Sequence, residues 1–353
     1  MTGDLRKVST ILALFLSSCT TSPVDDFGPL PLQTQGVYVL NEGMPGHSNS
    51  SLTFYVPDSN KVYPDIFKSV NGRDLGDVGS DMAISGARAF IVVSGSDKIE
   101  VIRTADNVSV QTIFLKAGRG PFNILIYGSK GYVSNYNAQS VTVFDINTYS
   151  ILRDSLGVGP YPQGLTTTLG KVYACNSGQG EERTVSVIDG STDRVVRTLE
   201  VGDGPTEAKV SSDGYVWILC TGSSNRGTTG KIFVIQPYTD AVVDSISVGG
   251  HPFRITTTFD ATTKNGFAYV VGDNRILQYN TRINQLVTSG FVVGSATSFL
   301  YSVAVDDFTG DVYVGDATSS FDRNGEVRIY RSDGMLRGTF ETGIVPGTLI
   351  FFR

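Results

Sequence analysis

The sequence predicts an all-β fold, a seven-bladed β-propeller with four-stranded blades, from three observations. Four segments beginning at residues 99, 141, 185 and 232 each contain an alternating strand, a polar turn, a second strand and a terminal Gly. A turn with a proline and two more strands follow each segment, and these prolines, at 121, 162, 205 and 252, lie 41, 43 and 47 residues apart. Four strands in roughly 40 to 50 residues is the period of a propeller blade, and residues 36–353 supply seven such periods.

The first 35 residues precede the repeats and predict an exported, anchored protein. Residues 1–18 combine Arg6 and Lys7 with an apolar run that is too short to span a bilayer, which is the pattern of a signal peptide. The run ends in Leu16-Ser17-Ser18-Cys19, which resembles the bacterial lipobox, so we expect Cys19 to be lipidated. Residues 19–35 contain three prolines and no periodic pattern, which indicates a tether.

Residues 36–353 are expected to form a single ring. The first segment, residues 36–68, contains strands for GVYVLNE, LTFYV and KVYPDIF, which makes only three. The missing innermost strand is predicted at the far end of the chain, in IVPGTLIFF at residues 344–352. A blade completed by both ends of the chain closes the ring and removes open sheet edges.

The strands between the turns carry mostly β-branched and aromatic residues, which predicts packing between blades. Val141, Val143, Val185 and Val187 fit a sheet that is covered on both faces. Cys175 and Cys220 lie in corresponding strands of adjacent blades, one residue out of register. We therefore expect two buried free thiols rather than a disulfide.

Composition excludes several functional classes. The net charge of −6 argues against a nucleic-acid binder, because phosphate neutralisation requires a surplus of Lys and Arg. The sequence lacks a phosphate-binding glycine loop and a G-x-S-x-G elbow. His47 and His251 are the only histidines, which excludes a multi-histidine metal centre. We therefore expect no catalytic activity and no required cofactor.

The loops between second and third strands, and those leading into each innermost strand, converge on one face of a propeller. In this sequence they are rich in Asn, Arg, Tyr and Phe, a composition suited to a planar, amide-rich molecule or a glycan. We expect aromatic rings to stack on the ligand and Arg and Asn to hydrogen-bond to it. The candidate binding residues are Asn41, Glu42, His47, Asn71, Arg73, Arg119, Phe122, Tyr136, Tyr161, Arg226, Phe253 and Arg254.

The repeats, with the pattern D-x-x-T-x-x-V-x-x-T-L-x-V-G at 189–202, resemble those of YncE-like, surface-layer-type seven-bladed propellers. The passage with Leu40-Asn41-Glu42-Gly43, Asn71-Gly72 and Leu75-Gly76-Asp77 is similar to BtuG-type surface lipoproteins of Bacteroidetes. That resemblance implies a lipid anchor at the outer membrane or cell surface. It also implies capture of cobalamin or another corrinoid, without catalysis, for a TonB-dependent transporter.

Two other classes of function remain open. A propeller enzyme of the lactonase or lyase kind would place carboxylate-bound calcium at the axis, with Glu42, Asp74, Glu207, Asp273 and Asp316 as available oxygen ligands. A protein-interaction scaffold would use the same face. Fold alone does not separate these functions.

Overall fold

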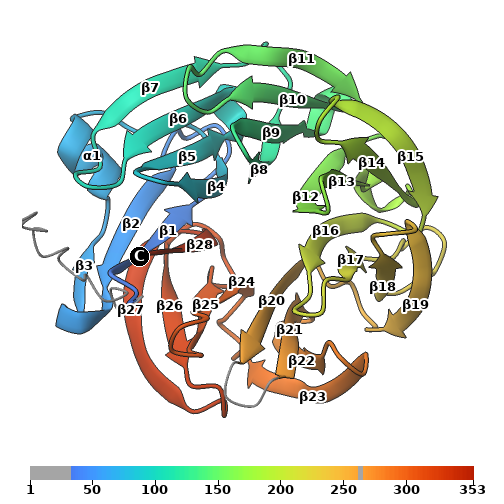
Figure 1. Cartoon of the computed structure of the whole chain (residues 1–353). Coiled ribbons are helices and arrows are strands. Elements are labelled where there is room, and N and C mark those ends of the chain that lie inside the picture. Colours follow the sequence, from blue (N-terminus) through green and yellow to red (C-terminus); the bar gives the residue numbers. More distant parts are fainter. Residues whose placement is uncertain (1–32, 261–264) are drawn as a thin grey trace, which may run out of the picture. The chain divides into compact units, whose positions relative to one another are not determined.

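The computed structural model describes residues 33–260 and 265–353, which form seven four-stranded antiparallel sheets arranged around an axis (Figure 1). Six blades are consecutive runs of four strands, and in each the first strand is innermost. The predicted all-β seven-bladed propeller is therefore confirmed.

The strands have the following bounds. Blade 1 contains β28 (Pro346–Phe352), β1 (Gly36–Asn41), β2 (Ser51–Val56) and β3 (Lys61–Tyr63). Blades 2 and 3 contain β4 (Gly79–Ser85), β5 (Arg88–Val93), β6 (Lys98–Arg103), β7 (Ser109–Phe114), β8 (Pro121–Tyr127), β9 (Lys130–Asn135), β10 (Ser140–Asp145) and β11 (Ile151–Gly157). Blades 4 and 5 contain β12 (Pro162–Thr168), β13 (Lys171–Asn176), β14 (Thr184–Asp189), β15 (Arg194–Glu200), β16 (Pro205–Val210), β17 (Val216–Cys220), β18 (Lys231–Gln236) and β19 (Ala241–Ser247). Blades 6 and 7 contain β20 (Arg254–Asp260), β21 (Asn265–Gly272), β22 (Arg275–Asn280), β23 (Gln285–Val293), β24 (Leu300–Val305), β25 (Val312–Asp316), β26 (Asn324–Tyr330) and β27 (Leu336–Ile344).

The ring is closed as the sequence predicts. β28 pairs with β1 in antiparallel register from Gly36 opposite Phe352 to Leu40 opposite Thr348. The C-terminal strand is therefore the innermost strand of the blade whose other strands come from the beginning of the ring (Figure 1).

The first blade differs from the expectation in its outer strand. The predicted strand 61–67 ends at Tyr63, because Pro64 has no N–H to donate to the sheet. A short helix, α1 (Ile66–Asn71), follows, and the Asp65 side chain accepts a hydrogen bond from the Lys68 amide at its N-terminus. Residues 33–260 and 265–353 also contain four one-turn 3₁₀ helices, η1 (Pro57–Ser59), η2 (Ser94–Ser96), η3 (Tyr136–Ala138) and η4 (Gly178–Gly180).

Packing between blades follows the predicted alternation. Val185 and Val187 lie fully buried in one cluster between blades 4 and 5, and Val141 and Val143 lie in the preceding one. Cys175 and Cys220 are both buried free thiols, as expected. They belong to one hydrophobic cluster, because opposite faces of adjacent blades line the same interface.

A tyrosine that recurs at the same strand position in three blades forms a hydrogen bond to the next blade. The third residue of the second strand is Tyr38 in blade 1, Tyr132 in blade 3 and Tyr173 in blade 4. Each hydroxyl donates to a side chain in the turn before the outermost strand of the next blade, namely Asn107 at 2.5 Å, Asp193 at 2.5 Å and Asp240 at 2.8 Å.

Two faces of the ring can now be defined. The loop face carries the loops between second and third strands and the connections between blades, and the turn face carries the remaining turns.

The predicted signal peptide and Cys19 lie outside the described residues. No helix of the described residues is long and apolar enough to cross a membrane.

Candidate functional site

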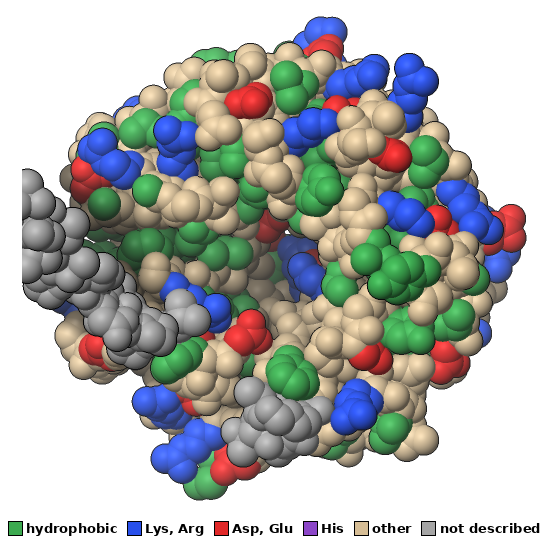
Figure 2. Space-filling model, in the orientation of Figure 1, with side chains coloured by type: hydrophobic (Ala, Val, Ile, Leu, Met, Phe, Trp, Pro, Cys, Tyr) green, Lys and Arg blue, Asp and Glu red, His purple; other side chains and the backbone are tan. Residues whose placement is uncertain are grey.

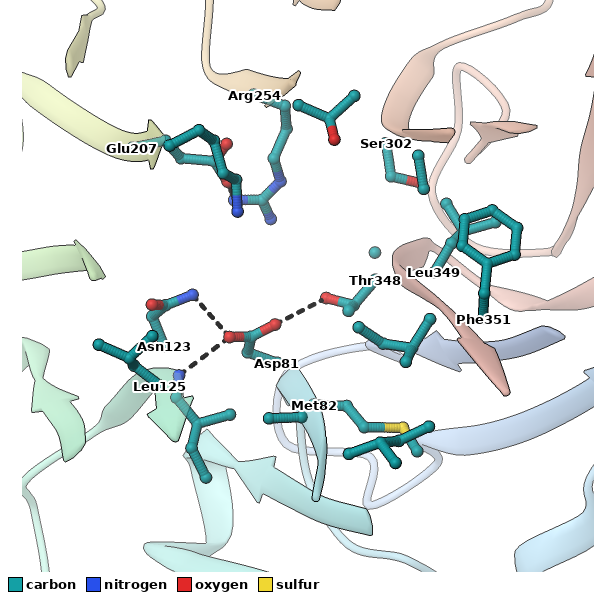
Figure 3. Close-up of a pocket in the computed structure, with 18 of the residues that line it drawn as sticks. Asp81, Met82, Asn123, Leu125, Glu207, Arg254, Ser302, Thr348, Leu349 and Phe351 are labelled. Carbon is teal, nitrogen blue, oxygen red and sulfur yellow. Dashed lines mark hydrogen bonds and ion pairs between the residues drawn. The ribbon is translucent and has the colours of Figure 1, made fainter. Parts of the chain in front are cut away.

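The innermost strands aim a ring of polar side chains at the axis. Most of these strands have a β-bulge near their start, for example between Gly79 and Asp81 in β4 and between Pro121 and Ile124 in β8. A bulge turns a side chain away from the regular alternation. We call the resulting set the axial ring, and it consists of Asp81, Asn123, Glu207, Arg254, Ser302 and Thr348, all of which line one cavity (Figure 3).

Side chains of the axial ring bind the next blade's strand. Asp81 accepts hydrogen bonds from the Asn123 amide group at 2.6 Å and the Ile124 backbone N–H at 2.9 Å, and Thr348 donates to it at 3.4 Å (Figure 3). Glu207 accepts from the Ile255 backbone N–H in the same way, at 2.7 Å. The hydrogen bonds of the axial ring therefore hold the starts of the innermost strands together around the axis.

Arg254 is the centre of the charged part of the ring. Its guanidinium group lies 3.2 Å from the Glu207 carboxylate and 3.6 Å from that of Glu42, which also accepts a hydrogen bond from the Tyr301 hydroxyl at 3.1 Å. Burial disfavours the charged form of Arg254, but the carboxylates raise its pKa. Burial also raises the pKa of Glu42, against the opposing effects of Arg254 and Tyr301.

One group of predicted aromatic residues comes together on the loop face of blades 3 and 4. The ring centroids of Phe122 and Tyr136 are 5.8 Å apart, and those of Tyr136 and Tyr161 are 5.0 Å apart. All three side chains are half-buried. Gln163 and Gln179 hydrogen-bond to Tyr136, so amide groups accompany the rings.

A second aromatic group lies on the loop face of blades 6 and 7. Phe253 stacks near Phe299 with a centroid distance of 6.0 Å, and Phe299 lies 4.8 Å from Phe321. Tyr301 completes the group, 5.8 Å from Phe253. Sequence reasoning identified Phe253 but missed Phe299, Tyr301 and Phe321 as site residues, although Phe321 lies in a loop that it assigned to this face.

The two aromatic groups flank the axis. Blade 5 separates them on one side of the ring, and blades 1 and 2 separate them on the other. The Arg254 cluster lies between them at the start of the innermost strands. The loop face therefore presents two aromatic groups, which we call the aromatic walls, with a charged, hydrogen-bonding cluster between the blades that carry them.

Four of the predicted residues donate side-chain hydrogen bonds to other parts of the fold. Asn41 is fully buried and donates to Ser51 and Thr53. Asn71 hydrogen-bonds to Phe67, Asn107 and Ser109. Arg73 hydrogen-bonds to Glu100 and Ser109. Arg119 hydrogen-bonds to Thr142 and Asp154. We therefore place these four in the scaffold beneath the loop face.

The other two predicted residues lie at its rim. His47 is exposed, with its Nδ1 atom 3.0 Å from the Pro45 carbonyl oxygen. Arg226 is partly exposed and pairs with Asp203 at 2.5 Å. Among the described residues, neither side chain forms a ring contact with an aromatic wall.

The carboxylates available for calcium are dispersed. Glu42 and Glu207 pair with Arg254, Asp74 pairs with Lys68 at 2.7 Å, and Asp316 pairs with Arg328 at 2.7 Å. Within residues 33–260 and 265–353, no three His, Cys, Asp or Glu side chains form a group that could hold a metal ion.

Comparison with known proteins identifies the family and supports the fold. A family model described as "Domain of unknown function (DUF5074)" matches residues 35–334. None of the curated protein sequences matches the chain. Three similar solved structures have 10–13% identity to the chain, so the likeness concerns the fold alone.

The first of these structures is a protein from Lactobacillus plantarum, with 13% identity, a TM-score of 0.66, and coverage of 91% of this chain and 100% of that one. A streptogramin B lyase has 10% identity and a TM-score of 0.58, with 88% and 89% covered. A virginiamycin B lyase from Staphylococcus aureus has 12% identity and a TM-score of 0.58, with 75% and 84% covered.

Proposed function

The chain belongs to the DUF5074 family, and we propose that it binds a small, partly planar molecule on the loop face without transforming it. The observation that supports this proposal is the pair of aromatic walls on either side of the Arg254 cluster. Aromatic side chains offer flat apolar surface at low entropic cost, and a few fixed polar groups between them provide orientation.

A corrinoid is the first candidate ligand. Its wide, nearly planar ring with peripheral amides fits two aromatic walls accompanied by Gln163 and Gln179, and the sequence resembles corrinoid-capturing lipoproteins. A lipid anchor at Cys19, an outer-membrane or cell-surface location and delivery to a TonB-dependent transporter complete this proposal. They rest on the sequence resemblance alone.

Calorimetry with cyanocobalamin and cobinamide tests whether the ligand is a corrinoid. We expect binding at micromolar protein, and Phe253→Ala and Tyr136→Ala should each weaken it by about tenfold, because stacking on one aromatic ring contributes roughly 1–3 kcal/mol. Tyr238→Ala is the matched control, because Tyr238 is 78% exposed on the turn before β19 and belongs to the turn face. An absence of heat with both ligands would exclude the corrinoid proposal.

The same experiment distinguishes binding from catalysis. Mass spectrometry of the recovered ligand should show it unchanged after prolonged incubation, with and without calcium. A transformed ligand, with activity lost on chelation, would instead support an enzyme of the lactonase or lyase kind.

A further inference from the structure

The cavity lined by the axial ring has a volume of about 700 Å³ and continues along the axis below that ring. Its lining includes Gly86, Asp307 and Phe352, which lie at the turn-face ends of β4, β24 and β28, while Phe122 is the only member of the two aromatic walls that reaches it. The cavity therefore extends from the ring toward the turn face, away from the aromatic walls. Figure 2 shows the molecule hollowed at its centre, with Lys or Arg side chains beside hydrophobic ones.

A second layer of side chains lines this cavity below the axial ring. Residues two positions apart on a strand point to the same side, so the six members of the axial ring, with Gly164 at the same position of β12, predict the next layer. We call this layer the lower ring, and it consists of Ala83, Leu125, Thr166, Lys209, Thr256, Ala304 and Ile350, all of which line the cavity.

The lower ring contains one charge, on Lys209. In the described part of the chain, the Lys209 ammonium group forms no hydrogen bond and no ion pair within 4 Å. Thr166 and Thr256 occupy the same layer on the strands on either side of it, and neither hydroxyl has a hydrogen-bond partner among the described residues. A partly buried cation between two free hydroxyls is suited to one carboxylate group.

Neighbouring carboxylates do not fill this role. Asp81 is close enough to Lys209 to interact electrostatically, but its oxygens already accept hydrogen bonds from Asn123, Ile124 and Thr348. Glu207 is likewise bound to Arg254 and to the Ile255 backbone. The donors of the lower ring thus remain available to a molecule in the cavity.

The opposite side of the lower ring is apolar. Ala83, Leu125, Ala304 and Ile350 belong to blades 2, 3, 7 and 1 and lie across the cavity from blades 4 to 6. A cavity with one polar side and one apolar side matches an anion with a hydrocarbon chain. Burial of the chain contributes about 0.8 kcal/mol to the binding free energy for each CH₂ group removed from water.

We propose that the axial cavity is a second binding site, which takes a monocarboxylate with an aliphatic chain of medium length. Its carboxylate accepts hydrogen bonds from Lys209, Thr166 and Thr256, and its chain lies along Ala83, Leu125, Ala304 and Ile350. Of the residues proposed for the loop face, Phe122, Glu207 and Arg254 also line the cavity, but the lower ring contains none of them, so this proposal does not depend on the function proposed for the loop face.

Calorimetry of the wild-type protein with octanoate, octanol and acetate, each below any micellar concentration, tests the proposal. Octanoate should bind at least about tenfold more tightly than octanol, which lacks the charge, since a hydrogen bond to a charged group contributes roughly 1.5–3 kcal/mol. It should also bind at least about tenfold more tightly than acetate, which lacks the chain. Equal affinity for octanoate and octanol, or no binding of octanoate, would overturn the proposal.

Variants then locate the site. Lys209→Met keeps the length of the side chain and should weaken octanoate binding by about tenfold or more, whereas Lys209→Arg should retain most of it. Lys231→Met is the control, because Lys231 is exposed at the start of β18. Thermal unfolding checks that each variant is folded. Unchanged octanoate affinity in a folded Lys209→Met variant would place the binding elsewhere and contradict the assignment.

Discussion

Tyr161 and Phe321 belong to different aromatic walls and share an unusual backbone. Their φ angles are 47° and 56°, in the left-handed region that costs an L residue roughly 1–2 kcal/mol. Gly, Asn or Asp would relieve that cost. The same left-handed φ precedes the innermost strand at Val78 and Val345, with values of 53° and 58°, so at Tyr161 it belongs to the blade repeat.

Replacing Tyr161 with Gly should separate stability from binding. The relief of strain offsets the lost contact with Tyr136, which contributes roughly 0.5–1.5 kcal/mol, so we expect the free energy of unfolding to change by less than about 1 kcal/mol. Binding of a loop-face ligand should weaken by about tenfold in calorimetry. Leu169→Gly is the matched control, because Leu169 has a φ of 51° in the turn between β12 and β13 and should leave binding unchanged. A severe loss of stability in Tyr161→Gly would show that the tyrosine serves the fold.

Asp81 predicts a pH dependence of stability. Burial raises its pKa, although the Ile124 amide and Lys209 oppose this effect. The folded state therefore binds a proton more readily than the unfolded state, so the free energy of unfolding should fall as pH rises from about 4 through the raised pKa. Asp81→Asn should remove this component, whose slope against pH is at most about 1.4 kcal/mol per pH unit for one proton.

Urea unfolding between pH 4 and pH 8 measures this difference. Glu200→Gln, on the exposed side of β15, should follow the wild-type profile in parallel. If Asp81→Asn also ran parallel to wild type, the Asp81 carboxyl would not be the source of the pH dependence.

Among the elements, positions that recur in several blades belong to the scaffold. Asn41, Asn135 and Asn176 each end the second strand of a blade, and each donates to Ser or Thr on the neighbouring third strand. Loop composition alone nevertheless predicts Asn41 as a ligand-binding residue. The recurrence of Asn at this strand end was visible in the sequence and indicated a structural role.

Positions that vary from blade to blade mark the candidate sites. The position of the axial ring is Asp81 in β4, Asn123 in β8, Glu207 in β16 and Arg254 in β20. The sequence predicted Arg254 and Glu42, but it could not predict that they meet Tyr301, because that contact joins residues 259 positions apart. The β-bulges before Asp81, Asn123 and Glu207 also leave no clear pattern in one sequence.

The Tyr173 bridge between blades 4 and 5 should contribute strongly to stability. Asp240 accepts hydrogen bonds from the Tyr173 hydroxyl and the Lys171 ammonium group, both at 2.8 Å. Asp240→Ala leaves the buried hydroxyl without an acceptor, so we expect the free energy of unfolding to fall by about 2–3 kcal/mol in urea titrations. Tyr238→Ala, in the same turn, should change it by less than about 0.5 kcal/mol. Similar losses in the two variants would argue against the bridge as the cause.

At the scale of the molecule, the ring could be predicted because the sequence repeats with the period of one blade. The similar spacings of Pro121, Pro162 and Pro205, at 41 and 43 residues, indicate the blade, and the length of the chain indicates the number of blades. The segment at 344–352 carries the same turn proline, at Pro346, which identified it as the closing strand. The cavity could not be predicted, because its layers depend on how all seven innermost strands align.

Closure by β28 predicts how the whole ring unfolds. Deletion of residues 345–353 removes the innermost strand of blade 1 and exposes the inner edge of β1, which is fully buried from Gly36 to Asn41. We expect this variant to lose the cooperative unfolding transition in circular dichroism. A circular permutant that places residues 345–353 before Gly36 restores the strand from the other side, because Gly36 already pairs with Phe352. It should fold with an intermediate midpoint, since blades 7 and 1 then meet through packing without the chain connection from β27 to β28. A deletion variant that unfolds as cooperatively as wild type would mean that the packing between blades closes the ring without β28.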